Sequence, residues 1–107
     1  MKVYIASPYK KGDKQENVMR QISAFNALVT HGHVPFAPNL GHYVDIHYPR
    51  PCTWWIEHDL VWLEFCDALL RLDGESNGAD IEVARAKELG IPVFYSLREL
   101  VRHGNNN

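Results

Sequence analysis

The sequence predicts an α/β protein: a small doubly wound parallel sheet of about four strands, in the order 2-1-3-4, with flanking helices. Two observations support this prediction. Four short apolar runs, at residues 2–6, 33–38, 67–72 and 91–94, have the character of strands, and segments with helical spacing separate them. Glycine and proline stand at the junctions and mark turns. With 107 residues, the chain is expected to form one domain over 1–104, followed by an asparagine tail at 105–107.

The helices have recognisable starting signals. Asp13 and Glu16 form a capping-box-like start to the first helix, ahead of an apolar stripe. Thr53 is expected to cap the second helix, which continues to about residue 66. A short helix over 97–103 is expected to end the domain. The run at 33–38 contains two prolines, which predicts a strand at the edge of the sheet.

Composition excludes several classes of protein. The formal net charge of −2 provides no basic excess, so neither nucleic acid nor an anionic membrane surface is an expected partner. Cys52 and Cys66 are too few for a disulfide framework, and no signal peptide or spanning segment is recognisable, so a cytoplasmic protein is expected. The six histidines are scattered without metal-ligand spacing, and no metal or other cofactor is expected.

One stretch of the chain, residues 39–51, has no periodicity. A loop of this length is uncommon in so small a domain and is usually functional. We therefore expect residues 39–51 to form a lid or a pocket wall.

Two carboxylates fall on the apolar faces of helices that flank the third predicted strand. Glu82 lies within the stripe that Ala79 and Ala86 form, and Asp59 lies in the middle of a face that includes Leu63. An inward carboxylate must be paired, hydrated in a cleft or used for chemistry. Two such groups, with pKa values separated by burial and repulsion, provide the nucleophile and the acid that cleave glycosidic bonds. Ordinary pairing with the backbone, a lysine or an arginine is the structural alternative.

The loops after the first and third strands supply candidate binding groups, because ligands of doubly wound sheets bind where these loops meet. Ser76, Asn77 and Gly78 offer a hydroxyl, an amide and backbone N–H groups at a helix N-terminus, which suits a phosphate and also suits plain capping. The candidates in the loop after the first strand are Ser7, Tyr9, Lys10 and Lys11.

Aromatic side chains near these loops are candidates for stacking on a planar base. They are Tyr4, Tyr9, Trp54 and Trp55. Positions in the core explain these aromatic residues equally well, and Trp55 is expected there.

Three segments resemble the nucleoside 2-deoxyribosyltransferase-like superfamily. The strand, loop and helix over 72–90, followed by Ile91-Pro92-Val93, contain its Ser-x-Gly-x-x-x-Glu pattern. Asp59-Leu60-x-Trp62-Leu63-x-x-x-Asp67 is similar to the 2'-deoxynucleoside 5'-monophosphate N-glycosidase branch. The opening run over 3–9 resembles small members of the superfamily. Together the likeness covers nearly the whole chain.

This resemblance implies a role for several residues. Glu82, ionised, would attack C1', and Asp59, protonated, would protonate the departing base. Tyr4 would lie near the nucleophile, and Ser76 would bind a 5'-phosphate. Lys10 stands where the glycosidase branch has a phosphate-binding arginine. The resemblance also implies a homo-oligomer, a dimer or larger.

The expected function is therefore cleavage of the N-glycosidic bond of a nucleoside or nucleoside 5'-monophosphate, by a hydrolase or a deoxyribosyltransferase. Two alternatives remain: a non-catalytic nucleotide-binding module, and a glycohydrolase of NAD or another nucleotide. Phosphoryl transfer is disfavoured because no acidic metal-binding cluster accompanies the loop.

Overall fold

The structure, a computed structural model, describes residues 1–105 of the chain. Its elements follow one another in the order β1 (Lys2–Ala6), α1 (Lys14–Thr30), β2 (Val34–Phe36), the 3-10 helix η1 (Pro38–Leu40), α2 (Gly41–His47), α3 (Cys52–Leu63), β3 (Ala68–Arg71), α4 (Asn77–Glu88), β4 (Val93–Phe94) and α5 (Leu97–Asn105). The four strands form a single parallel sheet in the order β2-β1-β3-β4. The predicted fold class and strand order are confirmed.

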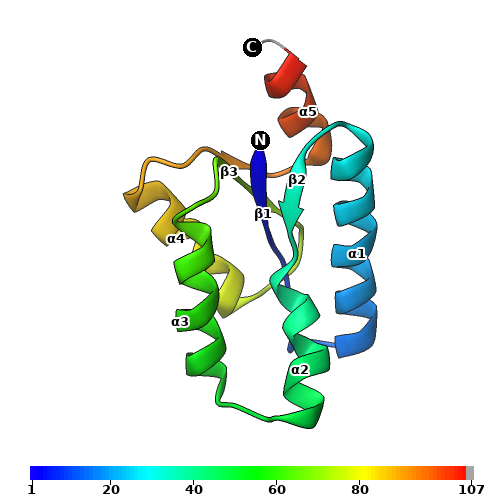
Figure 1. The fold of residues 1–107 in the computed structure, drawn as a ribbon, viewed down its shortest axis with the longest axis vertical. Helices are drawn as coiled ribbons and strands as arrows, with labels where there is room; N and C mark the ends of the chain where they lie inside the picture. The colour runs from blue at the N-terminus through cyan, green and yellow to red at the C-terminus, as the bar shows by residue number, and fades with distance from the viewer. Residues whose placement is uncertain (106–107) are drawn as a thin grey trace.

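The helices cover both faces of the sheet, with α1 on one side and α3 and α4 on the other (Figure 1). Successive side chains of β1 point to opposite faces, as the pleat requires. Val3 and Ile5 pack in a core with α1 and α5, whereas Tyr4 and Ala6 pack in a core with α3 and α4. Each face of the sheet therefore has its own apolar core.

Two of the predicted helix starts are confirmed. The Asp13 side chain accepts hydrogen bonds from the backbone N–H groups of residues 15 and 16, and α1 follows directly. The Ser76 side chain accepts from the backbone N–H of Ala79 at 3.1 Å and caps α4. Strand β2 lies at the edge of the sheet, as its prolines predict.

The predicted cap at Thr53 is wrong. Pro51, whose backbone is extended, is the N-cap of α3. The helix therefore begins at Cys52, and Thr53 lies inside its first turn. Helix α3 also ends at Leu63, earlier than expected.

The prediction of a loop over 39–51 is also wrong. This stretch contains the end of η1 and all of α2. A helix of seven residues has fewer than two full turns, too few to show a periodic pattern. Asn105 is the last residue of α5, so only residues 106–107 of the expected tail lie outside the described residues.

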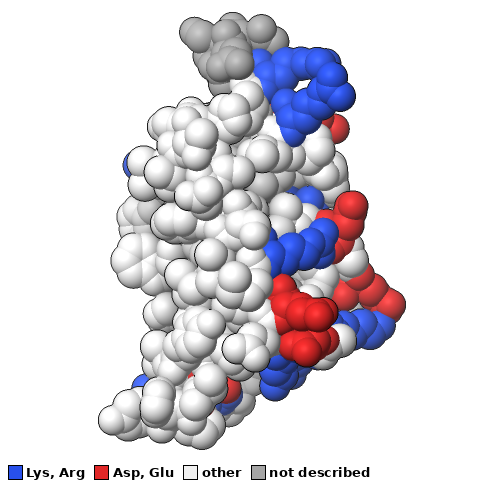
Figure 2. All heavy atoms as spheres, turned by 90° about the vertical axis from the view of Figure 1, so that its right-hand side faces the viewer, with Lys and Arg blue, Asp and Glu red and all other residues white. Residues whose placement is uncertain are grey.

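Charged side chains are unevenly distributed over the surface. Figure 2 shows a face on which most of the lysine, arginine, aspartate and glutamate side chains gather along one edge, with both signs mixed, while most of the remaining face is uncharged. Among the described residues on this face there is thus no continuous basic surface. No described helix has the length and apolar character needed to cross a membrane.

Candidate active site

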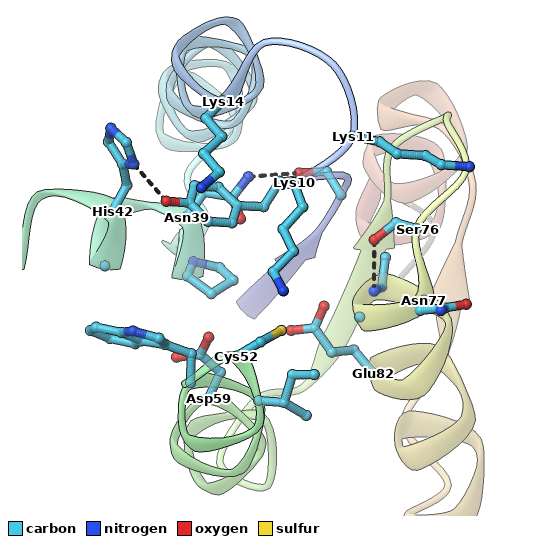
Figure 3. A pocket seen from close by; sticks show the side chains of 18 of the residues that line it. Lys10, Lys11, Lys14, Asn39, His42, Cys52, Asp59, Ser76, Asn77 and Glu82 are labelled. Atoms are coloured by element: carbon cyan, nitrogen blue, oxygen red, sulfur yellow. Dashed lines mark hydrogen bonds between the residues drawn. The ribbon is translucent and has the colours of Figure 1, made fainter. Parts of the chain in front are cut away.

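A cavity of about 690 Å³ lies beyond the carboxyl ends of β1 and β3. Its walls come from the loops after these strands, from η1 and α2, and from the inner faces of α3 and α4 (Figure 3). This is the switch point of the doubly wound sheet, where the sequence predicted a ligand site. The cavity is large enough for a small organic molecule.

Glu82 lines this cavity from α4. It is 8% exposed, on the face of α4 that also buries Ala79 and Ala86. The Tyr4 hydroxyl donates a hydrogen bond to Glu82 Oε2. Burial raises the pKa of Glu82 to about 8, because a carboxylate loses its hydration there. The bond from Tyr4 favours the ionised form and opposes this effect of burial.

Tyr4 itself does not line the cavity. It is fully buried in β1, 78 residues away from Glu82 in sequence, and its ring lies 5.5 Å from that of Phe36. It therefore contacts the carboxyl from the side of the sheet and is not part of the cavity wall. The Glu82 carboxyl is thus hydrogen-bonded to a residue of β1, an inner strand of the sheet.

Asp59 lines the same cavity from α3. Its side chain is 14% exposed, and burial raises its pKa to about 6, although a hydrogen bond from the His58 ring, at 3.1 Å, lowers it. Burial therefore raises the pKa of Glu82 above that of Asp59, because Glu82 is the more deeply buried group and Asp59 has an imidazole partner. In the empty cavity this order favours the proton on Glu82, whereas the resemblance implies an ionised Glu82 and a protonated Asp59.

All six residues predicted to bind substrate line the cavity: Ser7, Tyr9, Lys10, Ser76, Asn77 and Gly78. Lys10 extends from the β1–α1 loop into the cavity, with its ammonium directed toward Glu82 (Figure 3). Lys11 forms an ion pair with Glu75 at 2.6 Å, at the cavity wall. The N-terminus of α4 and Lys10 together make this wall favourable for an anion.

The loop ahead of α4 is held in place by arginines from two other elements. Arg20 of α1 donates to the carbonyl oxygen of Asp73, and Arg71 of β3 donates to the carbonyl oxygens of Leu72 and Gly74. Gly74 has a φ of +119°, and a Cβ there would lie 2.7 Å from the Pro8 ring. Only glycine fits this turn, which sets where Ser76 and the first turn of α4 meet the cavity.

Sequence reasoning missed much of the wall opposite α4. The predicted pocket-wall stretch does border the cavity, through Asn39, His42 and Asp45 among others, but as part of η1 and α2. His42 Nδ1 lies 2.6 Å from the Tyr9 hydroxyl. A polar, aromatic-rich stretch without periodicity was the available signal, and it gave the location without giving the individual residues.

The predicted stacking aromatics separate into different environments. Trp55 lines the cavity, half-buried, and its Nε1–H donates to Asp45 at 2.7 Å, so it is not the core residue that was expected. Trp54 is outside the cavity wall and stacks on His58, with the rings 5.1 Å apart. Tyr9 borders the cavity beside Lys14. Within residues 1–105, no three His, Cys, Asp or Glu side chains gather as a metal site would require.

Comparison with known proteins gives a family and a fold. Residues 1–96 match the family described as "Domain of unknown function (DUF7768)". No curated protein matches the chain. Among solved structures, the chain is similar to the 2-deoxyribosyltransferase of the psychrotolerant bacterium Bacillus psychrosaccharolyticus, with a TM-score of 0.63 and 23% identity over 87% of this chain and 69% of that one. The chain therefore shares the doubly wound fold of that enzyme.

Proposed function

Since the chain belongs to the DUF7768 family, a domain of unknown function, we propose an activity from its fold and its cavity. The protein cleaves the N-glycosidic bond of a nucleoside or nucleoside 5'-monophosphate. The sugar passes through a covalent ester on Glu82, and then to water or to a second base. The similar solved structure supports nucleosides as the substrate class, because that 2-deoxyribosyltransferase is described as a biocatalyst for nucleoside synthesis.

The observation that carries this proposal is that two largely buried carboxyl groups line the same cavity. Glu82 and Asp59 both line it, from different helices, and burial separates their pKa values, to about 8 and about 6. Two carboxyl groups in one cleft whose pKa values differ because of their surroundings are typical of a general acid and a nucleophile. Neither carboxyl forms an ion pair with a lysine or arginine among the described residues.

The reaction proceeds in two balanced steps. An oxygen of ionised Glu82 attacks C1', the C1'–N bond breaks, and the proton of Asp59 moves to the departing base. Water or an incoming base then attacks C1' from the opposite face, the ester bond to Glu82 breaks, and Asp59 takes the proton of the attacking group. Both carboxyls return to their starting states.

The protonation order at rest sets a condition on the first step. With pKa values of about 8 and about 6, moving the proton from Glu82 to Asp59 costs about 3 kcal/mol in the empty site. A bound substrate reduces this cost, because its base covers Asp59 and excludes water, which raises the pKa of Asp59. The hydrogen bond from Tyr4, which is present with or without substrate, also favours the ionised form of Glu82.

We further propose that Lys10 and the N-terminus of α4 bind a substrate phosphate. Ser76 already caps α4 through its oxygen, which leaves its hydroxyl proton available for a ligand. Asn77 and Gly78 supply N–H groups that the helix itself leaves without partners. Lys10 adds a full positive charge on the same side of the cavity.

A homo-oligomer is part of the same proposal. Large apolar side chains of α2, α3 and the segments that follow them are exposed: Tyr43, Val44, Ile46, Tyr48, Val61, Trp62 and Phe65. Apolar exposure of this extent favours association. Light scattering on a size-exclusion column is expected to give at least twice the 12.3 kDa mass of one chain.

The test of the activity is a substrate panel scored by chromatography for free base. The panel contains nucleosides and deoxynucleosides, their 5'-monophosphates, and NAD, each with and without a second base. Release is expected from a nucleoside or 5'-monophosphate, and an exchanged base in the product identifies a transferase. Release from NAD alone would instead identify a glycohydrolase of NAD.

Two variants make this test specific. Glu82→Gln keeps the shape of the side chain but removes the nucleophile, so base release is expected to fall at least 1000-fold. Glu57→Gln is the matched control, because Glu57 is exposed on α3 and outside the cavity wall, and its activity is expected to equal that of the wild type. Full release by Glu82→Gln would refute the covalent role, and ligand binding without any release would identify a binding module.

A further inference from the structure

The Ser7 side chain stands at the carboxyl end of β1, where it borders the cavity although it is only 5% exposed. Two side-chain amides surround its oxygen. Gln21 of α1 donates from Nε2 to Ser7 Oγ at 2.9 Å, and Asn39 of η1 donates from Nδ2 at 3.5 Å. Both lone pairs of the hydroxyl are thus engaged by N–H donors.

The direction of these bonds is fixed by the other contacts of the two amides. Gln21 Oε1 accepts from the backbone N–H of Asn39 at 3.0 Å, and Gln21 Nε2 also donates to the carbonyl oxygen of Ile5 at 2.9 Å. Asn39 Nδ2 donates to the carbonyl oxygen of Pro8 at 3.1 Å. Rotating either amide by 180° would place oxygen against a carbonyl oxygen, so both nitrogens must face their present partners.

The proton of Ser7 is not used in these contacts. Among the described residues Ser7 Oγ donates no hydrogen bond, and its two hydrogen-bond partners are amide nitrogens, which are donors. The two amides come from α1 and η1, and Ser7 itself lines the cavity, where a ligand can accept its proton. A buried hydroxyl proton without a partner is costly, and a ligand acceptor in the cavity removes that cost.

We propose that Ser7 acts only as a hydrogen-bond donor to the substrate, and that Gln21 and Asn39 are positioning residues that impose this polarity. The site then selects a ligand with an acceptor oxygen at this point, and rejects one that presents an N–H group there. This inference rests on the proposed function for the nucleoside nature of the ligand. The acceptor belongs to the sugar hydroxyls, the 5'-phosphate or a base carbonyl, and ligand analogues separate these sources.

The test measures binding by calorimetry in the Glu82→Gln background, so that turnover does not interfere. The probes are 2'-deoxyadenosine 5'-monophosphate, 2'-deoxyadenosine, 2',5'-dideoxyadenosine, 2',3'-dideoxyadenosine and 2'-deoxyinosine. Ser7→Ala is expected to weaken the ligands that carry the recognised oxygen by about 3- to 10-fold, or more for a phosphate. The analogue that lacks this oxygen should bind Ser7→Ala and its parent equally.

A second variant tests the polarity itself. Gln21→Glu replaces the donor nitrogen with an acceptor oxygen, which turns the Ser7 proton away from the cavity. It is expected to show the same ligand-specific loss as Ser7→Ala, although Ser7 is retained. A merely structural role for Gln21 would weaken all ligands alike. If Gln21→Glu does not fold, Ser7→Thr is the complementary variant, since it retains the hydroxyl and should restore the discrimination.

The outcomes separate this inference from the proposed function. Ligand-specific loss in Ser7→Ala without base release by the wild type supports the inference and refutes the activity. An equal effect on every ligand, or none on any, overturns the inference even where base is released. Failure of every probe to bind would overturn both.

Discussion

Replacing Glu82 by glutamine isolates the energetic cost of burying this carboxyl. Its pKa is about 8 in the folded protein and near 4.5 in the unfolded chain, so between these values the folded state holds the extra proton. The contribution of Glu82 to stability is therefore greatest below about pH 4.5 and is lost as the pH rises toward 8. At 1.36 kcal/mol per pKa unit, Glu82 alone lowers the free energy of unfolding by about 5 kcal/mol over this range.

Glu82→Gln removes this dependence, because an amide does not ionise and its oxygen still accepts the bond from Tyr4. We expect the variant to be more stable than the wild type at pH 8, with little difference at pH 5. Urea unfolding from pH 5 to 9, followed by circular dichroism, measures the difference.

Asp59→Asn is the matched control. Its carboxyl has a pKa of about 6, so its contribution should be complete near pH 6, whereas that of Glu82 continues to about 8. Parallel stability curves for the wild type and Glu82→Gln across the whole pH range would refute the reasoning, since they would mean that Glu82 ionises normally in the folded protein.

Three further changes test the surroundings of the two carboxyls. Tyr4→Phe removes the donor behind the buried carboxyl of α4 and should slow base release at pH 7 by about 10- to 100-fold, while moving the rate profile to higher pH; an unmoved profile would contradict this. His58→Phe removes the bond that lowers the pKa of Asp59, so the pKa of Asp59 measured by NMR should rise. Gly74→Ala should cost more than about 1 kcal/mol in urea unfolding, because its methyl would meet a proline ring 2.7 Å away. Gly32→Ala, where φ is +82° and no atom lies within 4 Å, should cost clearly less. Equal costs at these two glycines would show that the close approach does not matter.

Much of the fold follows from short-range patterns in the sequence. The alternation of apolar runs and helical spacing is enough for the parallel sheet and its strand order, because each connection must cross over and bury both faces. Ser76 and Asp13 are capping residues with local bonds, so their roles are visible without tertiary contacts. The helix α2 is different: it is too short to show a period, and Asp45 in it accepts from the side chain of Trp55 in the next helix.

In the candidate site, too, some features follow from local sequence patterns and others depend on tertiary contacts. Helical spacing by itself determined that Glu82 and Asp59 face inward, and the loop composition determined which wall can accept an anion. Only the tertiary structure decided what surrounds these groups. It brings Tyr4 against Glu82 across 78 residues and encloses the Ser7 hydroxyl between two amides. It also raises the pKa of Glu82 above that of Asp59. Burial and hydrogen bonding depend on every element packed around a side chain, and no local pattern contains that sum.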